Sequence, residues 1–235
     1  MALLPGVLAE DSAALLAARA QAIMAGELAP ERWFYQHDSP SGAYEDLAYG
    51  DGFIGPSQAY RKVERLERDP LFRAWLEHAA LAPLVRALIA GPVALCRAVL
   101  WNKAPHGGTE LPWHQDGGPF WGLSQQPELQ LWTALDDAPR EAGCVEAIPG
   151  SHRGGLASPE GGTIPRACSD EQAHRARAYP AHRGDVLLLH NLVWHRSGRN
   201  TTAAPRRALS VCYMSAATRC TRKRNPRQFT RLFER

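Results

Sequence analysis

The 235-residue chain lacks several features that would define its class at once. No apolar run approaches the roughly 20 residues that a membrane-spanning helix needs, and Glu10 and Asp11 stand where a signal peptide would be basic and then apolar. The formal net charge is only +3, with Lys and Arg spread along the chain except near the C-terminus. We therefore expect neither a membrane nor a nucleic acid as partner, and a small molecule is the default substrate. The oligomeric state stays open.

Cysteine is scarce and irregularly spaced. The five cysteines are an odd number without a C-x-x-C pair, which disfavours a disulfide framework and a thiolate zinc site. A reducing compartment, the cytoplasm, fits this usage best. Internal repeats are also absent, and a chain of this length with 45% hydrophobic residues can bury one sizeable core. We therefore expect a single domain over residues 1–235.

The pattern of the chain changes near residue 91. In the first part, residues 1–91, helix starts are predicted at Asp11-Ser12, Asp69-Pro70 and Ala82-Pro83. Residues 33–57 are rich in Gly, Pro, Ser, Tyr and Asp, which predicts a long irregular segment of the kind that often forms a lid.

The second part, residues 92–218, is predicted to be β-rich. Short β-like runs separated by Gly and Pro occur at residues 93–102, 129–135, 144–148, 186–190 and 208–214. This pattern is typical of a β-barrel or sandwich. The basic stretch that follows, residues 219–235, is interpreted as a solvated segment.

Alternation along the strands predicts which side chains share a face. In residues 129–135 the leucines form one face, so Gln130 and Trp132 point the other way, into a site if the strand lines one. Arg206 shares its face with small residues further along its strand, which leaves room for a ligand. Arg97 has the parity to face the same site, although a surface position is favoured for an arginine.

Two runs contain residues of metal-ligand type. His114 and Asp116 lie two apart, and in extended backbone such residues point to the same side. A third ligand from the run 190–200 would complete a set of two histidines and one carboxylate, the facial triad of non-haem Fe(II) oxygenases. Along a continuous strand His190 has the opposite parity from His195, which favours a packing role for His190. A lone His-x-Asp is a weak signal, so the surrounding residues matter.

Those surroundings form an ordered set of blocks. The blocks are residues 101–105 (WNKAP), 111–116 (LPWHQD), 131–136 (LWTALD), 143–152 (ending IPGSH), 184–186 (GDV), 195–200 (HRSGRN) and 206–210 (RRALS). Together they resemble the phytanoyl-CoA dioxygenase family of Fe(II)/2-oxoglutarate-dependent oxygenases, over residues 93–216. The resemblance implies a mainly β fold, a double-stranded β-helix (jelly roll) core, preceded here by the N-terminal packing helices.

The resemblance also implies roles for individual residues. The iron ligands would be His114, Asp116 and His195. The residues that the match assigns to 2-oxoglutarate are Arg206, which would bind the distal carboxylate with its guanidinium fork, Ser197, Lys103 and Trp132. The implied cofactors are Fe(II), 2-oxoglutarate as cosubstrate, and O2.

The family implies oxidation of an unactivated C–H bond of a small metabolite, with release of succinate and CO2. Hydroxylation is favoured because related halogenases have Ala or Gly in place of the aspartate, whereas Asp116 is intact. Two alternatives stay open. A cupin-like metalloenzyme without 2-oxoglutarate would normally use His-x-His with a glutamate and would not need Arg206. A non-catalytic binding protein with the same fold is the other alternative.

Overall fold

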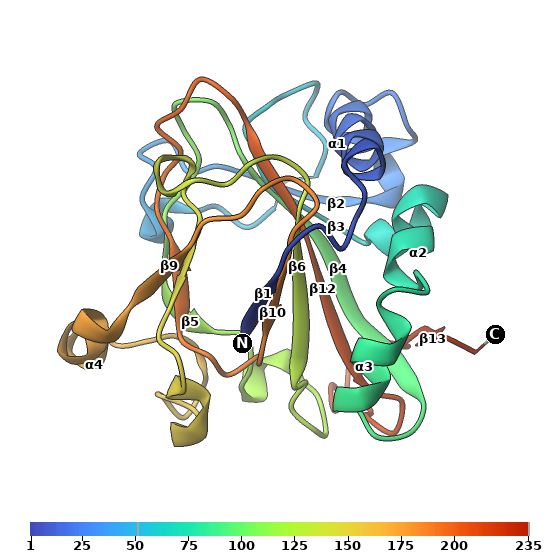
Figure 1. Ribbon diagram of the computed structural model, residues 1–235, viewed down its shortest axis with the longest axis vertical. Helices are drawn as coiled ribbons and strands as arrows, with labels where there is room; N and C mark the ends of the chain where they lie inside the picture. The colour runs from blue at the N-terminus through green and yellow to red at the C-terminus, as the bar shows by residue number, and fades with distance from the viewer. Residues whose placement is uncertain (51, 235) are drawn as a thin grey trace.

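Two antiparallel β-sheets face each other, and helices cover the outer face of the larger one (Figure 1). The structure is a computed structural model that describes residues 1–50 and 52–234. In spatial order the large sheet contains β1 (Ala2–Leu4), β10 (Val186–Leu189), β6 (Leu129–Ala134), β12 (Arg206–Ser215), β4 (Val93–Lys103), β3 (Tyr60–Glu64) and β2 (Phe34–His37). The small sheet contains β8 (Gly162–Thr163), β5 (Leu111–Gln115), β11 (His195–Ser197), β7 (Val145–Ala147) and β9 (Arg177–Tyr179). This arrangement confirms the predicted jelly-roll core with N-terminal packing helices.

The helices of the N-terminal part lie on one side of the large sheet (Figure 1). They are α1 (Glu10–Met24), α2 (Pro70–Leu76) and α3 (Ala82–Leu88), whereas α4 (Arg166–Gln172) lies beyond the small sheet. The predicted start of α2 is confirmed, because the Asp69 side chain accepts hydrogen bonds from the first backbone N–H groups of the helix. The predicted cap at Asp11-Ser12 is wrong: α1 begins one residue earlier, after Ala9, without a side-chain cap.

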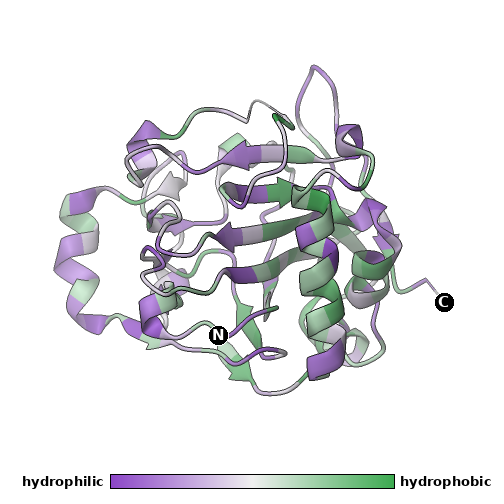
Figure 2. Cartoon of the chain, turned by 90° about the horizontal axis from the view of Figure 1, so that it is seen from above, coloured by the Kyte–Doolittle hydropathy of each residue, from purple (hydrophilic) through white to green (hydrophobic). Residues whose placement is uncertain are grey.

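The main hydrophobic core fills the space between the helices and the large sheet. Leu16 and Ile23 of α1 are buried there, together with Leu129 and Leu131 of β6. Hydrophobic residues concentrate where strands and helices meet, whereas the loops and α4 are mostly hydrophilic (Figure 2). The inner face of the large sheet is therefore left to form a pocket against the small sheet. In the described part of the chain, no helix has the length and apolarity needed to cross a membrane.

The N-terminal part is not only helical, which corrects the sequence interpretation. It contributes β1, β2 and β3 to the large sheet, and β2 lies inside the segment 33–57 that was expected to be irregular. Tyr35 of β2 is fully buried and packs against Tyr60 of β3, with ring centroids 4.8 Å apart. These strands are short and depend on partners far away in the sequence, so local pattern does not reveal them.

Most of the described C-terminal stretch is exposed, as interpreted, but its end joins the fold, which is a second correction. Within it β13 (Arg231–Leu232) pairs with the first residues of β4, and Leu232 is 2% exposed. Phe233 stacks on Tyr213 of β12 with ring centroids 6.0 Å apart. The stretch is basic in composition, but Leu232 and Phe233 join the main core and Phe229 packs on a smaller buried cluster.

Candidate active site

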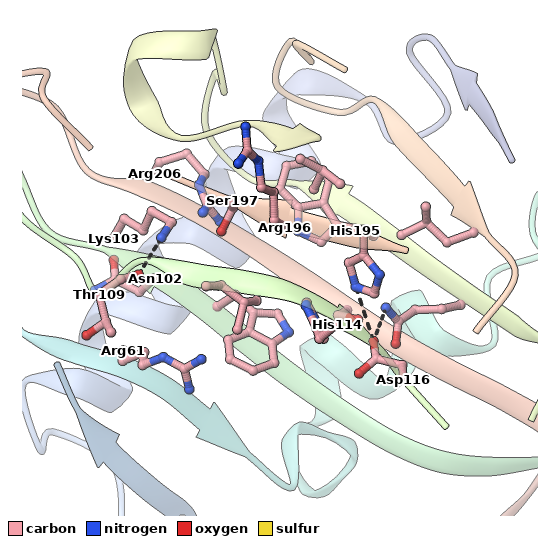
Figure 3. Close-up of a pocket in the computed structure, with 17 residues that line it drawn as sticks. Arg61, Asn102, Lys103, Thr109, His114, Asp116, His195, Arg196, Ser197 and Arg206 are labelled. Atoms are coloured by element: carbon pink, nitrogen blue, oxygen red, sulfur yellow. Dashed lines mark hydrogen bonds and ion pairs between the residues drawn. The ribbon is translucent and has the colours of Figure 1, made fainter. Parts of the chain in front are cut away.

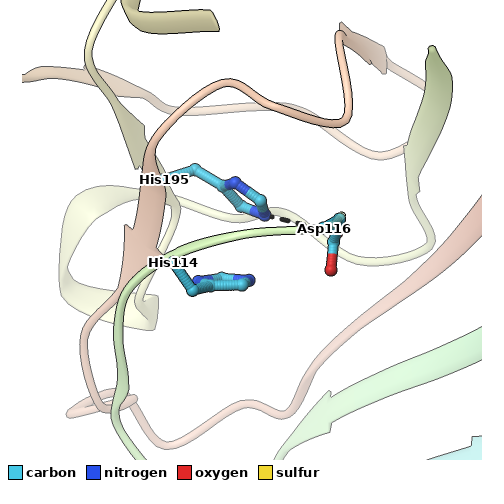
Figure 4. Close-up of side chains that lie close together, drawn as sticks. All are labelled: His114, Asp116 and His195. Carbon is cyan, nitrogen blue, oxygen red and sulfur yellow. Dashed lines mark ion pairs between the residues drawn. The ribbon is translucent and has the colours of Figure 1, made fainter. Parts of the chain in front are cut away.

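His114, Asp116 and His195 converge between the two sheets (Figure 4). His114 on β5 and His195 on β11 are direct cross-strand partners, and their ring centroids lie 4.0 Å apart. Asp116 follows the end of β5, and its Oδ2 lies 3.5 Å from Nε2 of His195. One potential ligand atom from each residue lies within 4.8 Å of the other two. The structure therefore gathers two imidazoles and one carboxylate in a geometry that can hold one metal ion.

Hydrogen bonds fix the orientation of both imidazole rings. Nδ1 of His114 lies 2.9 Å from the carbonyl oxygen of Pro112, and Nδ1 of His195 lies 2.9 Å from that of Val193. A carbonyl oxygen only accepts, so Nδ1 carries the proton in both rings and the neutral ring leaves the Nε2 lone pair free. This tautomer and this backbone partner are typical of metal-binding histidines.

Electrostatics keep His114 and Asp116 in the state that a metal ion requires. Burial disfavours the imidazolium form, and His195 adds repulsion, which together lower the pKa of His114 to about 3. Burial alone would raise the pKa of Asp116, but the Arg97 guanidinium and the two histidines hold it well below its usual range. At neutral pH His114 is therefore neutral and Asp116 is ionised, as metal ligands must be.

Two neighbours hold the Asp116 carboxylate. Nη2 of Arg97 donates to Oδ1 over 2.8 Å, and Nε2 of Gln130 donates to Oδ2 over 2.8 Å. The sequence placed Gln130 inward correctly. For Arg97 it favoured the surface, which is wrong: Arg97 faces the site and its guanidinium stacks on Trp121, 4.4 Å from the ring centroid. The signal for Arg97 was its strand parity, which pointed inward.

His190 lies outside this cluster, as the sequence favoured, although the reasoning assumed a continuous strand. In fact β10 ends at Leu189 and β11 starts at His195. The His190 ring lies against His152, with centroids 4.8 Å apart, and its Nδ1 accepts the backbone N–H of Leu192. Both residues therefore shape the turn that leads to His195.

All the residues that the sequence assigned to the cosubstrate line the same pocket as the triad (Figure 3). They are Arg206, Ser197, Lys103 and Trp132. Arg206 and Lys103 are cross-strand partners on β12 and β4, and Ser197 follows His195 on the same face of β11. The inward face of β12 carries small residues, as predicted, so the pocket is open above Arg206.

Arg206 and Lys103, the two cations on β12 and β4 that line the pocket, have few hydrogen-bond partners. Arg206 is 3% exposed and makes one hydrogen bond, from Nη2 to the carbonyl oxygen of Gly143 at 3.2 Å. Its Nε is buried and finds no partner among the described residues, and the same holds for the hydroxyl of Ser210. Lys103 donates from Nζ to the carbonyl oxygen of Thr109 over 2.7 Å. Buried donors in excess of acceptors indicate a site for an anion.

Burial acts on both cations. It lowers the pKa of Arg206 to about 10. It also lowers the pKa of Lys103, to which the nearby charge of Arg206 contributes. Arg206 stays protonated at neutral pH. A bound dicarboxylate would supply the missing acceptors and reverse both shifts.

A jelly roll with two histidines and an aspartate between its sheets has the architecture of the non-haem, 2-oxoglutarate-dependent oxygenases. The family model described as Phytanoyl-CoA dioxygenase (PhyH) matches residues 1–208. The chain therefore belongs to the PhyH family.

Curated relatives agree with this membership. The chain is 29% identical to phytanoyl-CoA dioxygenase domain-containing protein 1 of Mus musculus over 197 residues, which cover 79% of this chain and 66% of that protein. It is 27% identical to the peroxisomal phytanoyl-CoA dioxygenase of Homo sapiens over 183 residues, 73% of this chain and 54% of that protein. The match thus spans no more than about two thirds of the length of either relative.

Solved structures share the fold. EctD from S. alaskensis, solved with 2-oxoglutarate and 5-hydroxyectoine, aligns with a TM-score of 0.75 and 21% identity over 97% of this chain and 77% of that chain. SnoK, an alpha ketoglutarate dependent carbocyclase from nogalamycin biosynthesis, aligns with a TM-score of 0.73 and 22% identity over 98% of this chain and 90% of that chain. At such identities the likeness supports the fold and leaves the reaction to be argued from the site.

Proposed function

We propose that the protein is an Fe(II)/2-oxoglutarate-dependent dioxygenase that hydroxylates an unactivated C–H bond of a small molecule. The observation that carries the proposal is that one pocket contains both a metal site and an anion site. The His-Asp-His cluster lies at one end, and Arg206, whose buried Nε has no hydrogen-bond partner among the described residues, lies at the other. A metalloenzyme that used no dicarboxylate would have no use for a buried guanidinium with vacant donors, which disfavours the cupin-like alternative. Membership of the PhyH family supports the proposal independently.

The residues fit the implied cofactors. His114 and His195 would hold the iron through their Nε2 atoms, because each Nδ1 is already hydrogen-bonded. Asp116 would add a carboxylate oxygen, which keeps a lone pair beside the hydrogen bonds from Arg97 and Gln130. When bound, iron with 2-oxoglutarate activates O2 and oxidises a substrate C–H bond, with succinate and CO2 as coproducts. The protein positions the cosubstrate and the metal ligands, supplies charges that complement the cosubstrate, and excludes water from the pocket.

Each part of that contribution belongs to particular side chains. Arg206 would receive the distal carboxylate on its two-pronged guanidinium, and Ser197 and Lys103 would add single donors beside it. Trp132, with the Arg206 guanidinium 5.7 Å from its ring centroid, forms an apolar wall that keeps water from this end. Arg97 and Gln130 keep the Asp116 carboxylate in place while the ligands change around it.

Hydroxylation is the outcome that the intact Asp116 supports, because it leaves no vacant ligand position for a halide. Proteins of the same fold include an epimerase and a carbocyclase by name, so the fold alone does not select the outcome. The five cysteines, all within the described residues, are free thiols, which supports a reducing compartment such as the cytoplasm.

The test is an anaerobic titration of the purified protein with Fe(II) and 2-oxoglutarate, followed by visible absorbance. We expect a weak charge-transfer band that is lost in His114→Ala, Asp116→Ala and Arg206→Ala and retained in His174→Ala, which removes an exposed histidine far from the pocket. Under O2, a metabolite panel should stimulate succinate release by the wild type. A band that survives in Arg206→Ala, or succinate release that survives in Asp116→Ala, would contradict the proposal.

A further inference from the structure

A β-bulge on β3 points two consecutive basic residues toward the same side of the sheet. Gln36 of β2 pairs with Lys62 of β3, and the next residue, His37, pairs with Tyr60, so Arg61 has no partner on β2. In a regular strand Arg61 and Lys62 would face opposite sides, whereas a bulge re-aims one of them. Both cations accordingly stand beside the ring of Trp101, at 4.9 and 6.0 Å from its centroid.

Arg61 and Lys62 line a cavity that opens from the metal centre toward solvent. Its volume is about 460 Å³, and His114 and Asp116 form its floor. A cavity of that size holds a small organic molecule beside the reacting centre. Arg206 does not line this cavity, whereas Arg61 and Trp101 line both the cavity and the pocket that contains Arg206 (Figure 3). The cavity and the Arg206 pocket therefore adjoin, and Arg61 lies where a second ligand could reach it beside the cosubstrate.

Arg61 differs from the other cations of the cavity wall. Lys62 is paired with Glu64 over 2.7 Å, and Arg97 is paired with Asp116 over 2.8 Å. Arg61 is 6% exposed, yet its one hydrogen bond to a side chain goes from Nη1 to the neutral amide oxygen of Gln36 over 3.0 Å. No carboxylate of the described chain lies within ion-pair distance of it. A buried, unpaired guanidinium is costly unless a ligand supplies the charge.

Aromatic side chains form a large part of the remaining cavity wall, beside small and polar residues. Trp101 and Trp121 flank its inner part, and Tyr49 and Phe120 stand at its mouth with 87% and 54% of their surface exposed. Flat apolar side chains that stay exposed around a cavity indicate contact with a flat or apolar ligand. The wall thus combines a fixed positive charge with aromatic surfaces.

We infer that the substrate carries an anionic group, a carboxylate or a phosphate, which Arg61 binds, on a planar or apolar skeleton that lies between the tryptophans. This inference rests on the proposed function, because it treats the cavity beside the triad as the substrate site. Arg61 would anchor the anion away from the metal ligands. The skeleton would then extend toward the floor of the cavity, where the C–H bond is oxidised.

The probes are three compounds with one ring system: naphthalene-2-carboxylate, 2-naphthyl phosphate and the neutral 2-naphthamide. Binding is measured by calorimetry on the protein loaded with Fe(II) and 2-oxoglutarate without O2. A charge-assisted hydrogen bond to Arg61 predicts that at least one anion binds about 10- to 100-fold more tightly than the amide. The tighter of the two anions identifies the group. Equal binding of all three, or no binding of any, would overturn the inference.

Variants locate the effect. Arg61→Gln should abolish the preference for the anion, Arg61→Lys should retain part of it, and Arg166→Gln, on an exposed side chain, should leave it unchanged. Thermal unfolding of each variant checks that the fold is intact. A preference that persists in folded Arg61→Gln would overturn the inference.

The same variants separate this inference from the proposed function. The charge-transfer band with 2-oxoglutarate should be the same in Arg61→Gln and in the wild type. Loss of the band in folded Arg61→Gln would show that Arg61 binds the cosubstrate, which overturns the inference and leaves the function standing. If the wild type itself lacks the band, the proposed function fails. The affinities for the two anions and the amide are then compared by calorimetry on the protein without iron, which tests the inference separately.

Discussion

Replacing Arg206 by methionine should leave the ligand-free protein stable and remove its response to 2-oxoglutarate. In the ligand-free protein the guanidinium is buried with one weak hydrogen bond and an unpartnered Nε. Removing such a charge relieves its desolvation, so we expect a free energy of unfolding within about 1 kcal/mol of the wild type, or higher. Replacing a buried arginine that forms an ion pair would instead lower the free energy of unfolding by several kcal/mol.

With 2-oxoglutarate the two proteins should diverge. At a ligand concentration of 100 times Kd, the wild type gains about 2.7 kcal/mol. For a chain of this size that corresponds to a rise in Tm of about 5 to 11 °C. Arg206→Met loses two charge-assisted hydrogen bonds, about 3 to 6 kcal/mol together, which weakens binding roughly 10²- to 10⁴-fold. At the same concentration its Tm should rise by no more than about 2 °C.

Thermal unfolding with and without 2-oxoglutarate is the assay, and Arg206→Lys is the matched variant that keeps the charge but lacks the fork. Its shift should fall between those of the wild type and Arg206→Met. If 2-oxoglutarate raised the Tm of Arg206→Met as much as that of the wild type, the assignment of Arg206 to the cosubstrate would be refuted. A large loss of ligand-free stability would refute the reasoning that the guanidinium lacks a partner.

The same residue predicts a pH dependence. Burial lowers the folded-state pKa of Arg206 to about 10, below its unfolded value, so the unfolded chain binds more protons above that pH. The contribution of Arg206 to stability therefore rises with pH above about 10. A bound dicarboxylate favours the charged form, so affinity for 2-oxoglutarate should fall as pH rises through the same range. Because other groups titrate there, the measurement is the difference between the wild type and Arg206→Met.

Three further predictions concern the supports of the site and the fold. Asp136→Ala leaves the half-buried Arg207 without its two-pronged partner at 2.7 and 2.8 Å, which should cost about 3 to 5 kcal/mol and lower Tm by about 6 to 20 °C. Gln130→Leu removes a donor to Asp116 and should weaken metal binding about 10- to 100-fold in a metal titration. Leu232→Ala should cost about 2 to 5 kcal/mol in urea unfolding, because β13 is part of the core.

Each of these has a control. Asp170→Ala removes an exposed carboxylate and should leave Tm unchanged; an equal loss in both aspartate variants would contradict the role of the Arg207 pair. Gln130→Leu should keep the wild-type Tm within a few degrees, and unchanged metal affinity would refute its positioning role. Arg231→Ala, on an exposed neighbour, should be neutral, and a neutral Leu232→Ala would contradict the packing of β13 in the core.

Sequence reasoning predicted five of the strands, which are β4, β6, β7, β10 and β12. It also predicted the inward faces of β6 and β12 and the cluster of two histidines and one aspartate, because these depend on local periodicity and on an ordered set of short motifs. It misjudged Arg97, although strand parity pointed the residue inward. General preference places an unpaired arginine on the surface, and its partner, Asp116, becomes visible only when β4 and β5 are placed in space.

Features that depend on register between distant segments were out of reach. The bulge that aims Arg61 into the cavity is set by pairing with β2, which was itself not foreseen. The pairing of β13 with β4 joins residues more than a hundred positions apart, and nothing in the basic composition of the C-terminal stretch announces it.

The register of β12 against β4 sets Arg206 directly opposite Lys103. Like charges on neighbouring strands repel, and here both are buried. The ends of these strands should therefore open more readily than the rest of the sheet while the pocket is vacant. A dianion between the two cations would close them, so amide hydrogen exchange at the ends of β4 and β12 should slow before any substrate arrives. The like-charge pair would thus favour an order of binding in which the dicarboxylate binds first. The substrate would then bind after the ends of β4 and β12 have become ordered.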